Sequence, residues 1–303
     1  MAPNDNHSAC ADLGPNGRRS QTEDMTIPRR DVDFAFEAEN VPRDWCNNDP
    51  FQTTFLNALS LLFPEGERFF VESVKQHKQY VTTPELTAQV KGFIGQEAMH
   101  GKEHRAFNEL LTAHGYAVAP KVELRLRGFF KLVRKVLSPK SQLAATCALE
   151  HFTAMLAESL LRDERMRSEI DESVRGLWLW HALEESEHKA VAFDVYRAAN
   201  GGYVRRSGIM LLTTAVFFAV QMLTHARLMA TRGILFRPWK WLRGIGRLFV
   251  WPGHLTRLVP AYFAYFRPSF HPDDRDTRAL LTEWEARLFG SEGQLRTKLS
   301  LVA

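Results

Sequence analysis

The sequence predicts an all-α protein. No stretch alternates apolar and polar residues with the two-residue period of a half-buried strand. Long segments with helical spacing of apolar residues are instead separated by residues that start and stop helices. The chain has 303 residues, 45% of them hydrophobic, which is enough for a substantial core. We therefore expect a bundle of helices.

Capping residues mark the helices of the N-terminal two thirds. Asp49-Pro50 is typical of an N-cap followed by proline, Thr82 with Glu85 forms a predicted capping box, and Ser138-Pro139 starts a further helix. Pro64 is expected to restart or kink the first helix. The predicted segments are helices over 50–63, 65–80, 83–114, 139–166 and 171–199, with a basic amphipathic connector over 120–137.

The C-terminal third has a different character. Residues 207–226 contain no charged side chain, which is borderline for a spanning helix, so a buried core helix and a membrane-inserted helix both stay open. Residues 232–270 interleave Trp and Phe with Arg and Lys, as in helices that lie in the lipid headgroup layer. A short amphipathic helix is expected over 277–289.

Composition favours a cytoplasmic protein. The net charge is +4, and the basic excess lies after Arg197, which favours an anionic membrane surface as partner; no nucleic-acid-binding signature accompanies it. The three cysteines form no paired motif, and the polar first thirty residues lack the core of a signal peptide. We expect a disordered segment over 1–45, a metal-binding bundle over 46–202 and a hydrophobic, basic extension over 203–303 that packs on the bundle. Association with or anchoring in the inner membrane, and a homodimer, stay open.

Two Glu-x-x-His steps carry the chemical signal. Glu97 precedes His100, and Glu185 precedes His188, each by three residues within a predicted helix, so each pair projects from one face. A single step of this kind is common on solvated helix faces. Two steps, each preceded by a helix with an inward-facing glutamate, match the ligand set of ferritin-like di-iron and di-manganese bundles.

Counting residues selects the two other glutamates. Glu67 lies thirteen residues before Tyr80, and Glu97 lies thirteen after Pro84, so both sit about 20 Å from the turn at 1.5 Å per residue. Glu72 would miss this level by more than one helical turn, and the same count pairs Glu150 with Glu185. The predicted metal ligands are Glu67, Glu97, His100, Glu150, Glu185 and His188. Four carboxylates and two imidazoles suit two metal ions, with iron preferred and manganese or zinc as alternatives.

More polar groups share these helices than the minimum. His104 and His181 lie one turn from the predicted ligands, as extra ligands, as groups that orient a ligand, or as proton carriers. Glu184, His151 and Glu158 are further candidates for the same roles, although His151 is rotated about 100° from Glu150.

These motifs resemble a bacterial family of predicted metal-dependent hydrolases, a ferritin-like group, over about 51–260. The resemblance rests on FPEGERFF at 63–70, QEAMH at 96–100, LEHFT at 149–153, and the WH and EESEHK steps within 180–189. It implies a metal-dependent enzyme built on a four-helix bundle with a crossover connector. More widely, paired Glu and Glu-x-x-His helices are similar to those of di-iron oxidases and oxygenases, from whose minimal set His104 and His181 depart.

Three functions stay open at this point. The first, which we favour, is an oxidoreductase whose two irons, reduced by an electron-transfer partner, use oxygen to oxidise an apolar small molecule near the membrane. The second is a hydrolase of an ester or phosphate, in which two metals lower the pKa of a bridging water. The third is a membrane-associated protein that binds metal without catalysis.

Overall fold

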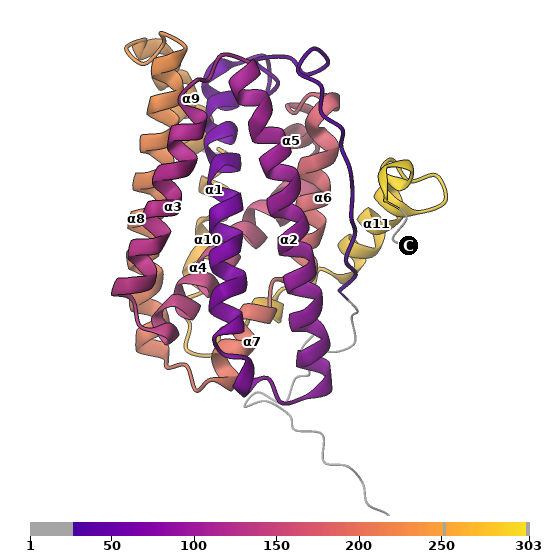
Figure 1. Cartoon of the computed structure of the whole chain (residues 1–303), viewed down its shortest axis with the longest axis vertical. Coiled ribbons are helices and arrows are strands. Elements are labelled where there is room, and N and C mark those ends of the chain that lie inside the picture. Colours follow the sequence, from indigo (N-terminus) through magenta and orange to yellow (C-terminus); the bar gives the residue numbers. More distant parts are fainter. Residues whose placement is uncertain (1–26, 251–252, 301–303) are drawn as a thin grey trace, which may run out of the picture.

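The computed structural model describes residues 27–250 and 253–300, and within them the regular elements are helical, apart from two isolated bridges. Four long helices pack side by side around the centre of the molecule (Figure 1). They are α1 (Pro50–Lys75), α2 (Pro84–Ala113), α4 (Pro139–Arg162) and α6 (Glu172–His188). The connector α3 (Ala119–Val136) joins the α1–α2 hairpin to the hairpin of α4 and α6. The all-α prediction is confirmed.

Caps and turns explain most boundaries, with two corrections. Asp49 accepts from the backbone amides of the first turn of α1, and Gly115, with φ +84°, follows the end of α2. The N-cap of α2 is Thr83 and not Thr82, because Pro84 occupies the first helical position and the cap must precede it. Pro64 does not end the first helix, since α1 continues through it to Lys75.

The predicted helix over 171–199 is divided in two. Its second part is α7 (Val191–Ala198), separated from α6 by Lys189 and Ala190. Short α5 (Glu164–Ser168) lies between α4 and α6.

The C-terminal extension packs on the bundle. α8 (Tyr203–Thr231) lies along α1 and α4, and is followed by α9 (Pro238–Phe249), α10 (Val259–Ala264) and α11 (Arg278–Phe289). Within the described residues, α8 alone is long and apolar enough to cross a membrane, and only 17% of its most apolar window is buried. It is therefore a surface helix and not the buried core helix that the sequence left open.

The segment before α1 is packed from residue 27 onward. It runs beside α2 and α6 in the right half of Figure 1, and Val32, Phe34 and Trp45 are at most 6% exposed. Residues 27–45 are therefore ordered, contrary to the expectation of disorder over 1–45. A few buried apolar side chains suffice to hold this mostly polar segment in place. Residues 1–26 lie outside the described part of the chain. This placement matters because the segment carries a charged residue to the site.

Candidate metal centre

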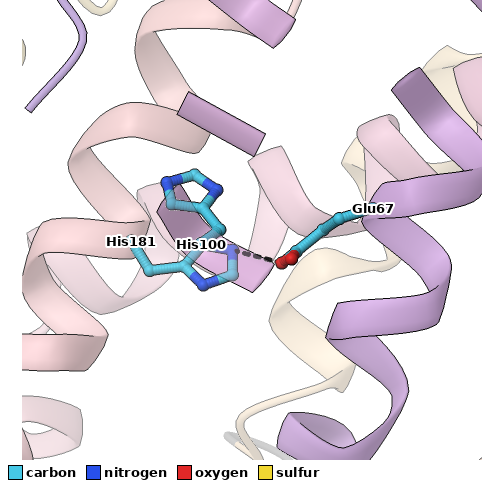
Figure 2. Close-up of side chains that lie close together, drawn as sticks. All are labelled: Glu67, His100 and His181. Carbon is cyan, nitrogen blue, oxygen red and sulfur yellow. Dashed lines mark ion pairs between the residues drawn. The ribbon is translucent and has the colours of Figure 1, made fainter. Parts of the chain in front are cut away.

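The structure brings the six predicted ligands together at the centre of the bundle. They are Glu67 from α1, Glu97 and His100 from α2, Glu150 from α4, and Glu185 and His188 from α6, each at most 2% exposed. Figure 2 shows the carboxylate of Glu67 facing the imidazoles of His100 and His181 across the interior of the bundle. The residue counts along the two hairpins therefore selected side chains that meet in space.

Distances divide the cluster into neighbouring subsites. Nε2 of His188 lies 3.4 Å from Oε1 of Glu97 and 3.5 Å from Oε2 of Glu150. Nδ1 of His100 lies 3.5 Å from Oε1 of Glu185 and 4.0 Å from Oε2 of Glu97. In each of these groups, one ligand atom per residue falls within 4.8 Å of the others, as a bound ion requires. Glu97 belongs to both groups, so its carboxylate lies between them.

The hydrogen-bonding pattern tests whether metal ions fit. Nine buried oxygen and nitrogen atoms of the six residues have no hydrogen-bond partner within the described part of the chain. They are both carboxylate oxygens of Glu67, Glu97 and Glu150, Oε2 of Glu185, Nδ1 of His100 and Nε2 of His188. Unpaired buried charge costs several kcal/mol per group. Metal cations between these atoms would satisfy them, so the residues fit a metal site.

The pKa shifts have the same origin. Burial raises the pKa of the Glu67, Glu97 and Glu150 carboxyls, and repulsion among the carboxylates adds to the effect. Burial also opposes ionisation of Glu185, but neighbouring imidazoles, with His188 first, lower its pKa. Burial disfavours the charged form of His100 too, yet carboxylates around it raise its pKa to about 10. This cluster attracts positive charge, which protons or metal ions can supply.

Each predicted histidine ligand is fixed by a contact on its outer side. Nε2 of His100 lies 3.0 Å from Oε2 of Glu184, and Nδ1 of His188 lies 2.8 Å from Oε1 of Gln96. Metal-binding histidines usually donate their second N–H to a carboxylate or carbonyl in this way, which leaves the other nitrogen free for the ion. Glu184 therefore lies where an orienting residue is needed.

Sequence reasoning missed the charged group behind these contacts. Arg30, from the segment before α1, donates to Glu187 at 2.8 Å and to Glu184 at 3.1 Å, and Gln96 donates to Glu187 at 2.6 Å. The guanidinium is only 7% exposed and compensates two carboxylates in the layer around the site. Gln96 could have been found from the sequence, since it directly precedes the predicted ligand Glu97. Arg30 could not, because it lies far from the ligands in the sequence and in no helical pattern.

A hydrogen-bonded chain directs His181 toward the centre. Pro64 has no N–H, so the carbonyl of Ser60 lacks its helical donor, and Asn108 donates to it at 3.1 Å. The amide oxygen of Asn108 in turn accepts from the Ser60 hydroxyl at 2.7 Å, so this hydroxyl accepts from Nδ1 of His104 at 2.8 Å. Nε2 of His104 then accepts from Nδ1 of His181 at 2.6 Å.

This direction leaves Nε2 of His181 without a proton. It lies 3.0 Å from Oε1 of Glu185 and 3.9 Å from Oε1 of Glu67. Burial, together with the charge of His100, lowers the pKa of His181 to about 4, so the ring is neutral. His181 also forms, with Glu67 and His100, a group whose ligand atoms lie within 4.8 Å of one another, as a bound ion requires. His181 is therefore placed as a third imidazole ligand, whereas His104 is placed to orient it.

Two other candidates lie away from the centre. His151 contacts the backbone carbonyl of Ala261 through Nε2 and packs against the ring of Tyr265. Its rotation around α4 from Glu150 turns it outward, as its position in the helix implied. Glu158 lies two turns farther along α4 and pairs with Arg162 and Arg275. The contacts of both residues are with groups other than the six ligands, and a role for either at the centre stays a prediction.

An apolar cavity of about 130 Å³ reaches the cluster from the side of α1 and α4. His181 and Glu185 belong to its lining, which also includes Glu169 and His254. The apolar wall includes Phe55, Leu59 and Phe63 from α1, and Leu156 and Leu160 from α4. From Phe51 to Phe63 it follows α1 for about 18 Å at 1.5 Å per residue. No lysine or arginine lines it within the described residues.

The family model described as "Predicted metal-dependent hydrolase" matches residues 28–276. The chain belongs to this family. Within the predicted metal-dependent hydrolases, the match spans the segment with Arg30, all helices of the bundle and the elements up to α10. The expected family is thus confirmed, and a metal-dependent enzyme fits it. The family description gives no support to the preferred oxidation of an apolar substrate, and the hydrolase alternative fits it better. Comparison with curated proteins and with solved structures gave no match.

Proposed function

We propose that this protein is a dinuclear metal-dependent hydrolase that cleaves an ester carrying an extended apolar chain. The observation that supports this most directly is the mainly apolar cavity whose lining includes His181 and Glu185, beside nine buried ligand atoms without partners. The family description supports the reaction class. Within the described residues, no arginine or lysine lines the cavity. This favours a neutral ester over a phosphate as substrate, because phosphate sites usually present arginine or lysine.

The residues divide the work between holding ions and holding substrate. When bound, two divalent ions polarise the carbonyl oxygen of an ester and lower the pKa of a coordinated water. Glu67, Glu97, Glu150 and Glu185, with the imidazoles, would hold those ions. The walls from α1 and α4 would take the apolar chain, exclude water from it and align the ester beside His181 and Glu185.

A chain-length series of nitrophenyl esters tests the proposal. The protein loaded with zinc or manganese, under argon, should cleave esters of long acyl chains faster than acetate esters. Ala157→Phe, in the cavity wall, should lower kcat/KM for long chains by roughly tenfold or more while sparing short ones. The matched control is Ala154→Phe on the same helix, which faces a separate pocket. No metal-dependent cleavage across the series, or cleavage indifferent to chain length, would refute the proposal.

Oxygen-dependent oxidation stays as a second candidate, because the donor set favours it. Four carboxylates with imidazoles in a buried bundle are the ligands of di-iron carboxylate proteins. An electron-transfer partner would have to supply reducing equivalents. Iron-loaded protein, a chemical reductant and long-chain alkyl substrates should then show substrate-dependent oxygen uptake. Oxygen uptake without anaerobic ester cleavage would replace the first proposal by this one.

A further inference from the structure

Helix α9 is fixed to the bundle by one side. Leu248 and Gly244 are buried there, and a Cβ atom added to Gly244 would lie 2.1 Å from the ring of Phe51. The ring of Trp241 contacts that of Phe51 at 5.4 Å between centroids. This close contact holds α9 against α1.

The same helix exposes a second set of large apolar side chains. Trp239 is 77% exposed, Leu242 63% and Phe249 43%, and Phe236 just before the helix is 92% exposed. At 100° per residue, apolar side chains and glycines cover about two thirds of the circumference of α9. Packing on one side needs a stripe of only about 100°. The rest of the apolar surface of α9 is exposed, which indicates a second apolar partner.

Charge identifies that partner. Residues 195–272 contain eleven Arg and Lys and no Asp or Glu, whereas the rest of the chain has 28 basic and 35 acidic residues. Several of the basic side chains pair with the bundle, for example Arg247 with Glu169 and Arg232 with Asp44. Arg237, the N-cap of α9, and Arg243 within the helix are exposed and form no ion pair with the residues that the structure describes.

We infer that α9 docks on the surface of an anionic lipid bilayer. Trp239, Leu242 and Phe249 enter the interface, and Arg237 and Arg243 meet the lipid phosphates. Tryptophan and basic residues are the side chains enriched at this depth. A second copy of the chain fits less well, because a twofold contact would bring the two basic surfaces against each other.

The docked helix lies next to the apolar cavity. Leu248, on its buried side, is part of the cavity wall, together with Leu255 of the following segment. An amphiphile in the bilayer would therefore be adjacent to the cavity. Only this link to substrate supply rests on the proposed hydrolase function. Docking itself is measured without turnover.

Vesicle flotation tests the docking. The full-length protein should float with vesicles of phosphatidylcholine and phosphatidylglycerol in equal parts, and much less with phosphatidylcholine alone. Arg237→Gln combined with Arg243→Gln should lower the partition coefficient roughly tenfold or more. Trp239→Ser combined with Leu242→Ser should lower the partition coefficient at least as far, since these two substitutions remove apolar side chains that enter the interface.

Two controls keep the result specific. Lys91→Gln on α2 and Val136→Ser at the end of α3 remove an exposed charge and an exposed apolar side chain elsewhere, and should leave flotation unchanged. Metal content should stay the same in all variants, which separates this inference from the proposed chemistry. The inference would be overturned if the controls lost flotation equally, or if the protein bound only neutral vesicles. It would also be overturned if the protein did not float but formed a dimer in solution that the Trp239→Ser variant dissociates.

Discussion

The interior of the bundle and the outer side of α9 depart from ordinary protein organisation in opposite directions. In the interior, carboxylates and imidazoles are buried with nine ligand atoms unpaired, whereas α9 exposes Trp239 and Leu242 to solvent. Polar groups normally find partners when buried, and apolar groups normally leave water. We propose that a component from outside the chain explains each exception: metal ions in the interior and lipid at the surface. Substitutions in the bundle interior and in α9 test the two explanations separately.

Glu67→Gln should have the largest effect, with opposite sign in the two metal states. In chelator, the variant should be more stable than the parent, since it removes a buried carboxyl whose pKa is raised by burial and by Glu97. With excess metal, the parent should gain about 4 kcal/mol at a thousandfold excess over Kd, and the variant much less. Thermal unfolding in both conditions measures this. Exposed Glu109→Gln on α2 is the control, and a variant that unfolds alike in both states would contradict the cation account.

Ser60→Ala should weaken metal binding by roughly ten- to hundredfold, the usual effect of losing a group that orients a ligand. The change removes the hydroxyl that accepts from His104 and so frees the tautomer of His181. Competition with a chromogenic chelator gives the affinity. Ser73→Ala is the matched control, because its buried hydroxyl lies on the same helix but contacts Thr146. Equal affinity in both variants would remove His181 from the ligand set.

Acidity should act differently on the metal-free and metal-loaded protein. The raised pKa values of Glu67, Glu97 and Glu150 mean that the folded metal-free state holds protons that the unfolded chain releases above about pH 4.3. Its unfolding free energy should therefore fall as the pH rises from there toward neutrality. Metal displaces those protons, so the stability of the loaded protein should rise over the same range. Denaturant titrations at several pH values, with chelator and with metal, measure both unfolding free energies. If the two change with pH in the same direction, this prediction is wrong.

Gly244→Ala tests the other region and should lower the free energy of unfolding by about 1–3 kcal/mol, because the new methyl group overlaps the Phe51 ring. Gly246→Ala on the same helix meets no atom within 4 Å and should be neutral or stabilising. Denaturant unfolding compares the two. Metal content should not change in either variant. Equal stability would show that α9 is not fixed on α1 as described.

Sequence spacing predicted which side chains meet at the centre of the bundle because helix geometry is regular. Glu97 with His100, and Glu185 with His188, share a face by their three-residue step, and equal distances from a turn bring two helices to one height. The same regularity excluded Glu72. It also implied that His151 would point elsewhere, since its neighbour Glu150 already faces the centre.

Contacts between distant segments could not be read from spacing. Arg30 reaches Glu184 and Glu187 from a segment without helical pattern, and its polar composition predicted disorder. The division between α6 and α7 has no proline or glycine to mark it. The surface position of α8 depends on what packs beside it, which composition does not specify. Tertiary packing decided all of these.

Metal stoichiometry tests the central claim most directly. Elemental analysis of the purified chain, stripped with chelator and reconstituted with iron, manganese or zinc in separate samples, should find two ions per chain in at least one of them. Glu97→Ala, which removes the carboxylate shared by both subsites, should lose both ions, and Glu109→Ala should keep them. A chain that binds none of these metals, or one that keeps two ions without Glu97, would contradict the dinuclear centre.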